Sequence, residues 1–249
     1  MSIDKKSIVS TRKLSITAIF TALVCVATMV IQTYVPATQG FFNIGESMVY
    51  LAAILFGPFV GAFAGGVGAM IADLLTGYAI YAPATLVVKA CEGAAVGYLV
   101  NKKPAFISSK SWKYITVILG ISVGLYIWWV GTNYYSGEMF LTSSLGQNLV
   151  LGEFELNIPS IVWAVIGLGV AVLLSFIGYR LEPEFGWTIF SVLIGGFIMT
   201  TGYYLYQQYF MGVAAIIEVP INLGQMTIGA AIALPLSKMV KKSLPDLLK

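Results

Sequence analysis

Apolar segments close to the thickness of a lipid bilayer follow one another along nearly the whole chain. Eight can be drawn: 14–34, 46–57, 60–77, 84–101, 113–131, 160–179, 187–209 and 216–240. Of the 249 residues, 58% are hydrophobic and 10% are charged, whereas about a quarter are charged in soluble domains. Because about 20 apolar residues in a helix cross a membrane, the sequence predicts an all-α integral membrane protein. No room is left for a soluble domain.

The basic residues predict how these eight spans are oriented. With the N-terminus in the cytoplasm and alternating spans, thirteen of the fourteen Lys and Arg fall on the cytoplasmic side, as the positive-inside rule requires. They are Lys5, Lys6, Arg12, Lys13, Lys102, Lys103, Lys110, Lys113, Arg180, Lys238, Lys241, Lys242 and Lys249. The long outer loop, 132–159, carries three Glu and no basic residue. We expect a multi-pass protein of the plasma membrane with both termini cytoplasmic.

Three charged side chains lie inside the apolar stretch 41–100: Asp73, Lys89 and Glu92, with Glu46 near its start. Ionisable groups inside a membrane are costly and usually face a bundle interior or a water-filled cavity. Lys89 and Glu92, at i and i+3, share a helix face and can pair. The charges are interpreted either as contacts for a polar solute or as a structural cluster that holds three helices together.

Other polar residues fall near the outer ends of at least four spans, given 1.5 Å per residue. Asn222 and Gln225 share one face of the last span, below Glu218, which together with Pro220 suits a helix start. The inner half is nearly bare of polar residues, which favours a pocket open to the outside. The predicted substrate-binding residues are Asn43, Glu46, Tyr81, Lys89, Glu92, Tyr203, Gln207, Asn222 and Gln225. Outer tyrosines are also typical of an interfacial belt.

Glycines at four-residue spacing, Gly57-Gly61-Gly65 and Gly93-Gly97, predict close helix packing. The glycine cluster at 65–68 is not a phosphate loop, because no Gly-Lys-Ser/Thr follows it. The chain contains no His, which excludes His-based acid–base chemistry and His metal sites. We expect no enzymatic activity, no cofactor, no metal and no nucleic-acid partner.

The segment with Asn43, Gly45 and Glu46, followed by LFGPFVGAFAGGVGAMIADLLTGYAIYAPATLVVKACEG, resembles the S components of energy-coupling-factor (ECF) transporters. It is most similar to the riboflavin-transporter-like branch. The last span, EVPINLGQMTIGAAIALPLSKMVKK, is similar to that family's final helix. The resemblance covers 14–101 and 187–242. It implies a membrane subunit that binds a vitamin from outside and hands it inward with a coupling protein and two ATPase subunits.

The resemblance also implies roles for individual residues. The pocket would use Asn43 and Glu46, the helix of Lys89 and Glu92, and the residues Gln207, Asn222 and Gln225. The small face at Ala18 and Ala22 would dock the coupling protein. Glu46 stands where many relatives carry Asp.

Family members have six helices, so the resemblance implies a two-helix insertion in a single membrane domain. Residues 1–103 would hold the first four helices, 104–186 an inserted hairpin with its outer loop, and 187–249 the last two. The inserted aromatic residues are interpreted as an interfacial belt or a lid: Tyr126, Trp128, Trp129, Tyr134 and Tyr135.

Two questions stay open at the level of sequence. Riboflavin, pyridoxine and a thiamine-precursor pyrimidine are all compatible with the predicted pocket. The chain could instead be a self-sufficient secondary transporter of a small polar solute that uses Asp73, Lys89 or Glu92.

Overall fold

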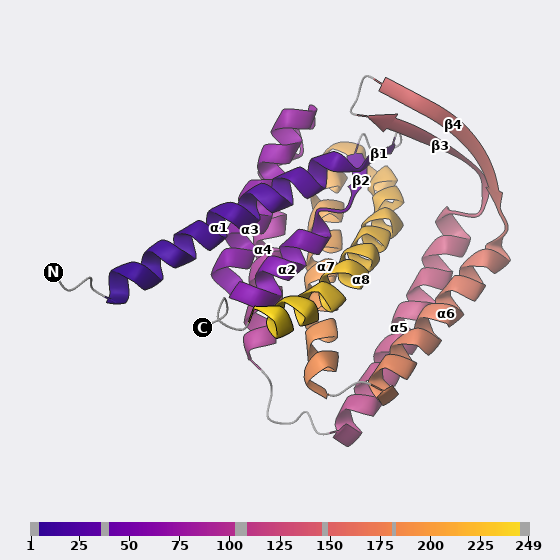
Figure 1. Ribbon diagram of the computed structural model, residues 1–249. Coiled ribbons are helices and arrows are strands. Elements are labelled where there is room, and N and C mark those ends of the chain that lie inside the picture. Colours follow the sequence, from indigo (N-terminus) through magenta and orange to yellow (C-terminus); the bar gives the residue numbers. More distant parts are fainter. Residues whose placement is uncertain (1–4, 36–39, 103–108, 146–148, 181–182, 245–249) are drawn as a thin grey trace.

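The computed structural model describes residues 5–35, 40–102, 109–145, 149–180 and 183–244, and this part of the chain contains eight α-helices and two short β-hairpins (Figure 1). The helices are α1 (Lys5–Val30), α2 (Glu46–Phe56), α3 (Pro58–Thr76), α4 (Ala82–Asn101), α5 (Ser109–Tyr134), α6 (Ser160–Arg180), α7 (Pro183–Met211) and α8 (Glu218–Ser243). A 3-10 helix, η1 (Gly212–Ile217), joins α7 to α8. Each predicted apolar segment therefore corresponds to one helix.

The predicted turn between the second and third segments is confirmed at Gly57. Its φ of +84° lies in the region that favours glycine, and Pro58 then occupies the first position of α3. Helix α2 has only 11 residues. Within the described residues, six helices are long and apolar enough to cross a membrane, whereas α2 and the apolar part of α6 are shorter.

Two antiparallel hairpins were not predicted. Strand β1 (Gln32–Val35) pairs with β2 (Gly40–Asn43) just before α2, and β3 (Gly137–Leu145) pairs with β4 (Leu149–Ile158) where the sequence predicted a loop. Strand β3 arches from the end of α5 to lie beside β1 (Figure 1). The hairpin thus reaches across one end of the bundle.

Helices α1, α2, α3, α4, α7 and α8 form one packed bundle, whereas α5 and α6 pack mainly on each other (Figure 1). Hydrogen bonds connect the end of α5 and the start of α6 to η1 of the bundle. The hydroxyl of Tyr135 donates to the carbonyls of Ile216 and Ile217 in η1, and Trp163 Nε1 donates to the Tyr135 carbonyl at 2.9 Å. Trp128 and Trp129 of α5 are exposed, and the side chain of Tyr134 lies outside the described residues. The insertion of this helix pair and its boundaries stay a prediction.

The predicted glycine packing is confirmed between α3 and α4. A Cβ on Gly93 would overlap the backbone of Gly61, and a Cβ on Gly97 would lie 2.5 Å from the backbone of Gly57 and Pro58. Only glycine allows the two backbones to approach this closely. These contacts fix the position of α4 along the axis of α3.

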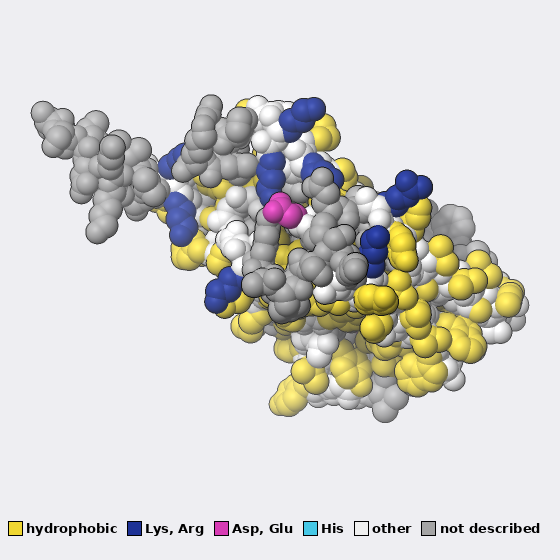
Figure 2. Space-filling model, turned by 90° about the horizontal axis from the view of Figure 1, so that it is seen from below, with side chains coloured by type: hydrophobic (Ala, Val, Ile, Leu, Met, Phe, Trp, Pro, Cys, Tyr) yellow, Lys and Arg dark blue, Asp and Glu magenta, His cyan; other side chains and the backbone are white. Residues whose placement is uncertain are grey.

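The described basic side chains other than Lys89 belong to the parts of the helices that lie toward one side of the bundle. They are Arg12, Lys13, Lys102, Lys113, Arg180, Lys238, Lys241 and Lys242. Figure 2 shows Lys and Arg side chains gathered on this face, called here the basic end. The side chains of Lys5, Lys6, Lys103, Lys110 and Lys249 lie outside the described residues. The clustering agrees with the predicted topology, in which these residues share one side of the membrane.

Candidate functional site

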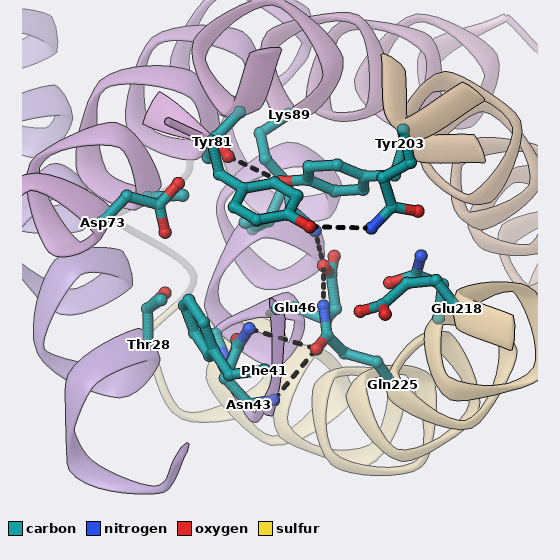
Figure 3. A pocket seen from close by; sticks show the side chains of 17 residues that line it. Thr28, Phe41, Asn43, Glu46, Asp73, Tyr81, Lys89, Tyr203, Glu218 and Gln225 are labelled. Carbon is teal, nitrogen blue, oxygen red and sulfur yellow. Dashed lines mark hydrogen bonds and ion pairs between the residues drawn. The ribbon is translucent and has the colours of Figure 1, made fainter. Parts of the chain in front are cut away.

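A polar cavity lies inside the six-helix bundle (Figure 3). Its lining residues belong to the ends of the helices that lie away from the basic end. Its walls come from the last turn of α1, strand β2, the first turn of α2, the second half of α3, the first half of α4, the end of α7 and the start of α8. The cavity has a volume of about 40 Å³. The cavity is therefore narrow, and its polar side chains stand close together.

Lys89 lies at the centre of a buried charge cluster. Its Nζ forms an ion pair with Glu46 Oε1 and a second, of 3.3 Å, with Glu92 Oε2. The hydroxyl of Tyr50 donates to Glu92 Oε1 at 2.8 Å. All four residues are buried. The predicted pairing of Lys89 with Glu92 is confirmed, and the cluster joins α2 to α4.

Gln225 of α8 connects this cluster to strand β2. Its Oε1 accepts hydrogen bonds from the backbone N and from Nδ2 of Asn43, at 2.9 and 3.0 Å. Its Nε2 donates to Glu46 Oε1 at 3.0 Å. Asn43 Oδ1 in turn accepts from the backbone N of Gly45 at 2.8 Å. Because a side-chain amide both donates and accepts, one glutamine aligns three segments of the cavity wall.

Tyrosines form a second wall of the cavity (Figure 3). The hydroxyl of Tyr203 donates to Thr85 Oγ1 at 3.0 Å, and Gln207 Nε2 donates to the Tyr81 hydroxyl at 3.2 Å. Lys89 Nζ lies 5.6 Å from the centre of the Tyr203 ring. Burial raises the pKa of Tyr81, just ahead of α4, to about 12. The phenol is thus neutral at physiological pH and can both donate and accept.

Four buried polar atoms on the cavity wall have no hydrogen-bond partner: Glu46 Oε2, Asp73 Oδ2, Gln207 Oε1 and Asn222 Nδ2. Their residues are at most 5% exposed. Buried polar atoms are nearly always paired, so each exception calls for an explanation. Unpaired groups that converge on one cavity favour a site for a polar solute.

Eight of the nine predicted substrate-binding residues line this cavity. They are Asn43, Glu46, Tyr81, Lys89, Tyr203, Gln207, Asn222 and Gln225. The ninth, Glu92, lies behind Lys89, fully buried, and does not line it.

The cavity also contains residues that were not among the predicted contacts: Thr28, Phe41, Asp73, Thr85 and Glu218. Glu218 lies four residues before Asn222 and seven before Gln225, so helical spacing places it on the same face of α8. Thr85 precedes Lys89 by one turn in the same way. Helical periodicity could have found both, whereas Thr28 and Phe41 depend on how α1 and β2 fold over the bundle.

The predicted docking residues lie away from the cavity. Ala18 and Ala22 are exposed on α1, and so are Ile19 and Leu23 beside them. The opposite side of α1 packs on α3, where a Cβ on Gly68 would lie 2.6 Å from the carbonyl of Thr21. An apolar surface with small residues is therefore available on the outer side of α1.

A known protein family and a known protein are similar to this chain. A family model described as the S component of an ECF-type riboflavin transporter matches residues 8–181. A protein of Pyrococcus woesei, named only as an uncharacterized protein in a gap 3′ region, is 36% identical over 163 residues, which cover 66% of this chain and 97% of the relative.

The family match differs from the range expected from sequence, because it runs through α5 and α6 and ends before α7. It therefore leaves the proposed insertion untested, while the packing of α7 and α8 places both in the cavity-bearing bundle. The match still covers well over half of the chain and includes the glycine ladder, Asn43, Glu46 and the Lys89–Glu92 pair. The chain belongs to the family of S components of ECF-type riboflavin transporters.

Proposed function

We propose that this chain captures a small water-soluble vitamin or related micronutrient in the polar cavity and delivers it across the membrane. It would do so together with a transmembrane coupling protein and two ATPase subunits. The proposal depends above all on the convergence of unpaired, buried polar atoms in a single cavity. A purely structural charge cluster would leave its buried groups paired.

The position of the cavity suggests the direction of capture. Basic residues gather in the cytoplasmic loops of membrane proteins. The basic end would therefore face the cytoplasm, the cavity would open to the outside, and the membrane in question would be the plasma membrane. A pocket that is open outward suits a subunit that collects its substrate before it meets the ATPases.

Proteoliposomes can separate this proposal from a secondary transporter that uses Asp73, Lys89 or Glu92. We expect vesicles with this chain alone to bind the micronutrient but to show no uptake, with or without a proton or sodium gradient. Vesicles that also contain the coupling protein and the ATPases should accumulate it when ATP is inside. Uptake driven by an ion gradient with this chain alone would overturn the proposal.

The exposed face of α1 provides a test of coupling. The variant Ala18→Trp places a large ring on the apolar surface that would contact the coupling protein. We expect assembly with that protein, measured by co-purification, to fall at least tenfold, because close packing between membrane helices requires small residues at the contact. Binding of the micronutrient should be unchanged, since Ala18 does not line the cavity.

Val87→Trp is a matched control on another helix. Val87 of α4 is also exposed and apolar, 61% by area. Assembly should persist in this variant. If Ala18→Trp assembled as well as the control, the docking role of α1 would be wrong.

A further inference from the structure

Helices α5 and α6, at the side of the bundle (Figure 1), touch through small residues. A Cβ on Gly124 would lie 2.4 Å from the Gly167 carbonyl, and a Cβ on Gly120 would lie 2.7 Å from the Ala171 carbonyl. Larger side chains line a groove along this contact, in two overlapping stretches of about 360 and 530 Å³. Six of them are apolar and exposed: Ile121, Leu125, Trp128, Leu168, Val172 and Phe176.

The groove opens away from the bundle. The opposite side of α5 is buried, and a Cβ on Gly186 of α7 would overlap the ring of Trp112 there. Ile121 follows Trp112 by nine residues, which at 3.6 residues per turn places the two on opposite sides of the helix. The groove therefore faces the lipid that surrounds a membrane protein.

Two cations lie at one end of the groove, the basic end of the molecule. The guanidinium of Arg180 lies 5.5 Å from the centre of the Phe176 ring, and Lys113 Nζ lies 4.7 Å from the centre of the Tyr179 ring. Phe176, Tyr179 and Arg180 all line the groove. Within the part of the chain that the structure describes, neither cation forms an ion pair with a carboxylate. An apolar groove thus ends at two positive charges that have no acidic partner there.

The length of the groove matches one leaflet of a bilayer. The stretch that ends at Arg180 begins at Leu168 on α6, and twelve residues of helix rise about 18 Å. Half of the hydrocarbon core of a bilayer is about 15 Å thick. A lipid with its headgroup beside Arg180 could therefore lay one tail along this stretch.

We propose that the groove between α5 and α6 binds an anionic phospholipid of the leaflet at the basic end. Its phosphate would lie between Lys113 and Arg180, and one hydrocarbon tail would fill the groove. The planar fork of arginine matches phosphate oxygens, and basic sites between membrane helices attract anionic headgroups.

Charge favours lipid over a second copy of the chain. Two copies in one membrane orientation would bring their basic ends to the same side, so a copy seated on the groove would add cations instead of balancing them. Among the described residues, the groove and the polar cavity share no lining side chain. The lipid site is therefore independent of the solute that the cavity captures.

The test titrates the full chain, purified in a non-ionic detergent, with two lipids that carry the same tails: anionic phosphatidylglycerol and zwitterionic phosphatidylcholine. Native mass spectrometry counts the lipid molecules bound at each concentration. We expect the first phosphatidylglycerol to bind at least tenfold more tightly than the first phosphatidylcholine.

A double variant, Lys113→Gln with Arg180→Gln, tests the cations. It should weaken binding of phosphatidylglycerol at least tenfold and leave affinity for phosphatidylcholine within twofold. The control, Lys102→Gln with Lys242→Gln, removes two exposed cations of the basic end that do not line the groove. It should change neither affinity, and thermal unfolding shows that each variant is folded.

Val172→Trp tests the place of the tail, because its ring would occupy the groove. Affinity for phosphatidylglycerol should fall at least threefold. Leu173→Trp is the matched control: Leu173 is also exposed and apolar, at nearly the same depth, but about 100° around the helix from Val172. It should bind lipid as the unaltered chain does.

Several results would overturn the assignment. They are equal affinity for the two lipids, full phosphatidylglycerol affinity in the double variant, or equal affinity in Val172→Trp and Leu173→Trp. Displacement of the lipid by glycerol phosphate at the same concentration would show a site for a free anion that needs no tail. A dimer that excludes lipid, and that Val172→Trp separates, would make a second copy the occupant.

Discussion

Replacing Lys89 by Met is expected to lower the free energy of unfolding by about 3–5 kcal/mol, the usual cost of removing one partner from a buried ion pair. Lys89 is 4% exposed, Glu46 is 1% exposed and Glu92 is fully buried. Without the ammonium group, two carboxylates would face each other in the bundle interior. Their repulsion and lost solvation, rather than the lost contact itself, account for the size of the effect.

A second substitution separates charge from packing. In the double variant Lys89→Met with Glu46→Gln, Glu92 stays as the one carboxylate of the cluster and still accepts from the Tyr50 hydroxyl. We expect at least half of the lost stability to return, because neighbouring substitutions in one network are not additive. Thermal unfolding of all variants in one detergent measures both effects.

Lys102→Met is the matched control, since Lys102 is exposed at the basic end of α4 and surface substitutions usually change stability by about 0.5 kcal/mol or less. A Lys89→Met protein as stable as this control would contradict the assigned ion pairs. Failure of the double variant to recover would mean that the volume of Lys89, and not its charge, holds the cluster together.

The sequence predicted the helices well because lipid imposes a strong constraint on them. A segment in the membrane must pair all its backbone groups internally, so apolar length identifies six of the described helices, while α2 and the apolar part of α6 are shorter. The two β-hairpins are under no such constraint. Strands β3 and β4 pair across a connection, and their place beside β1 depends on the tertiary fold, which apolar length does not report.

The candidate site shows a similar division. Asn43, Glu46, Lys89 and Gln225 could be predicted because a polar residue in or beside an apolar span has few structural explanations. The residue with which each of them forms an ion pair or hydrogen bond could not be predicted. The ion pair of Lys89 with Glu46 links α4 to α2, and only the packing of these helices brings the two together.

That packing depends on glycine, and Gly93→Ala is expected to disturb it. The new Cβ would overlap the backbone carbonyl of Gly61, and backbone cannot move aside as the end of a flexible side chain can. Helices α3 and α4 would have to separate. Overpacking of this kind costs about 1–3 kcal/mol, which outweighs the gain in helix propensity from Gly to Ala of about 1 kcal/mol.

The shift should also reach the cavity, because α3 and α4 touch again one turn further along, where a Cβ on Gly65 would lie 2.9 Å from the Lys89 carbonyl. Separation of the helices would move Lys89 away from Glu46 and weaken binding of the solute. Gly224→Ala is the control, since nothing lies within 4 Å of a Cβ at this position in α8. It should unfold at the same temperature as the unaltered chain or higher. If Gly93→Ala behaved like Gly224→Ala in both unfolding and binding, the backbone contact of α3 with α4 could not be what positions Lys89.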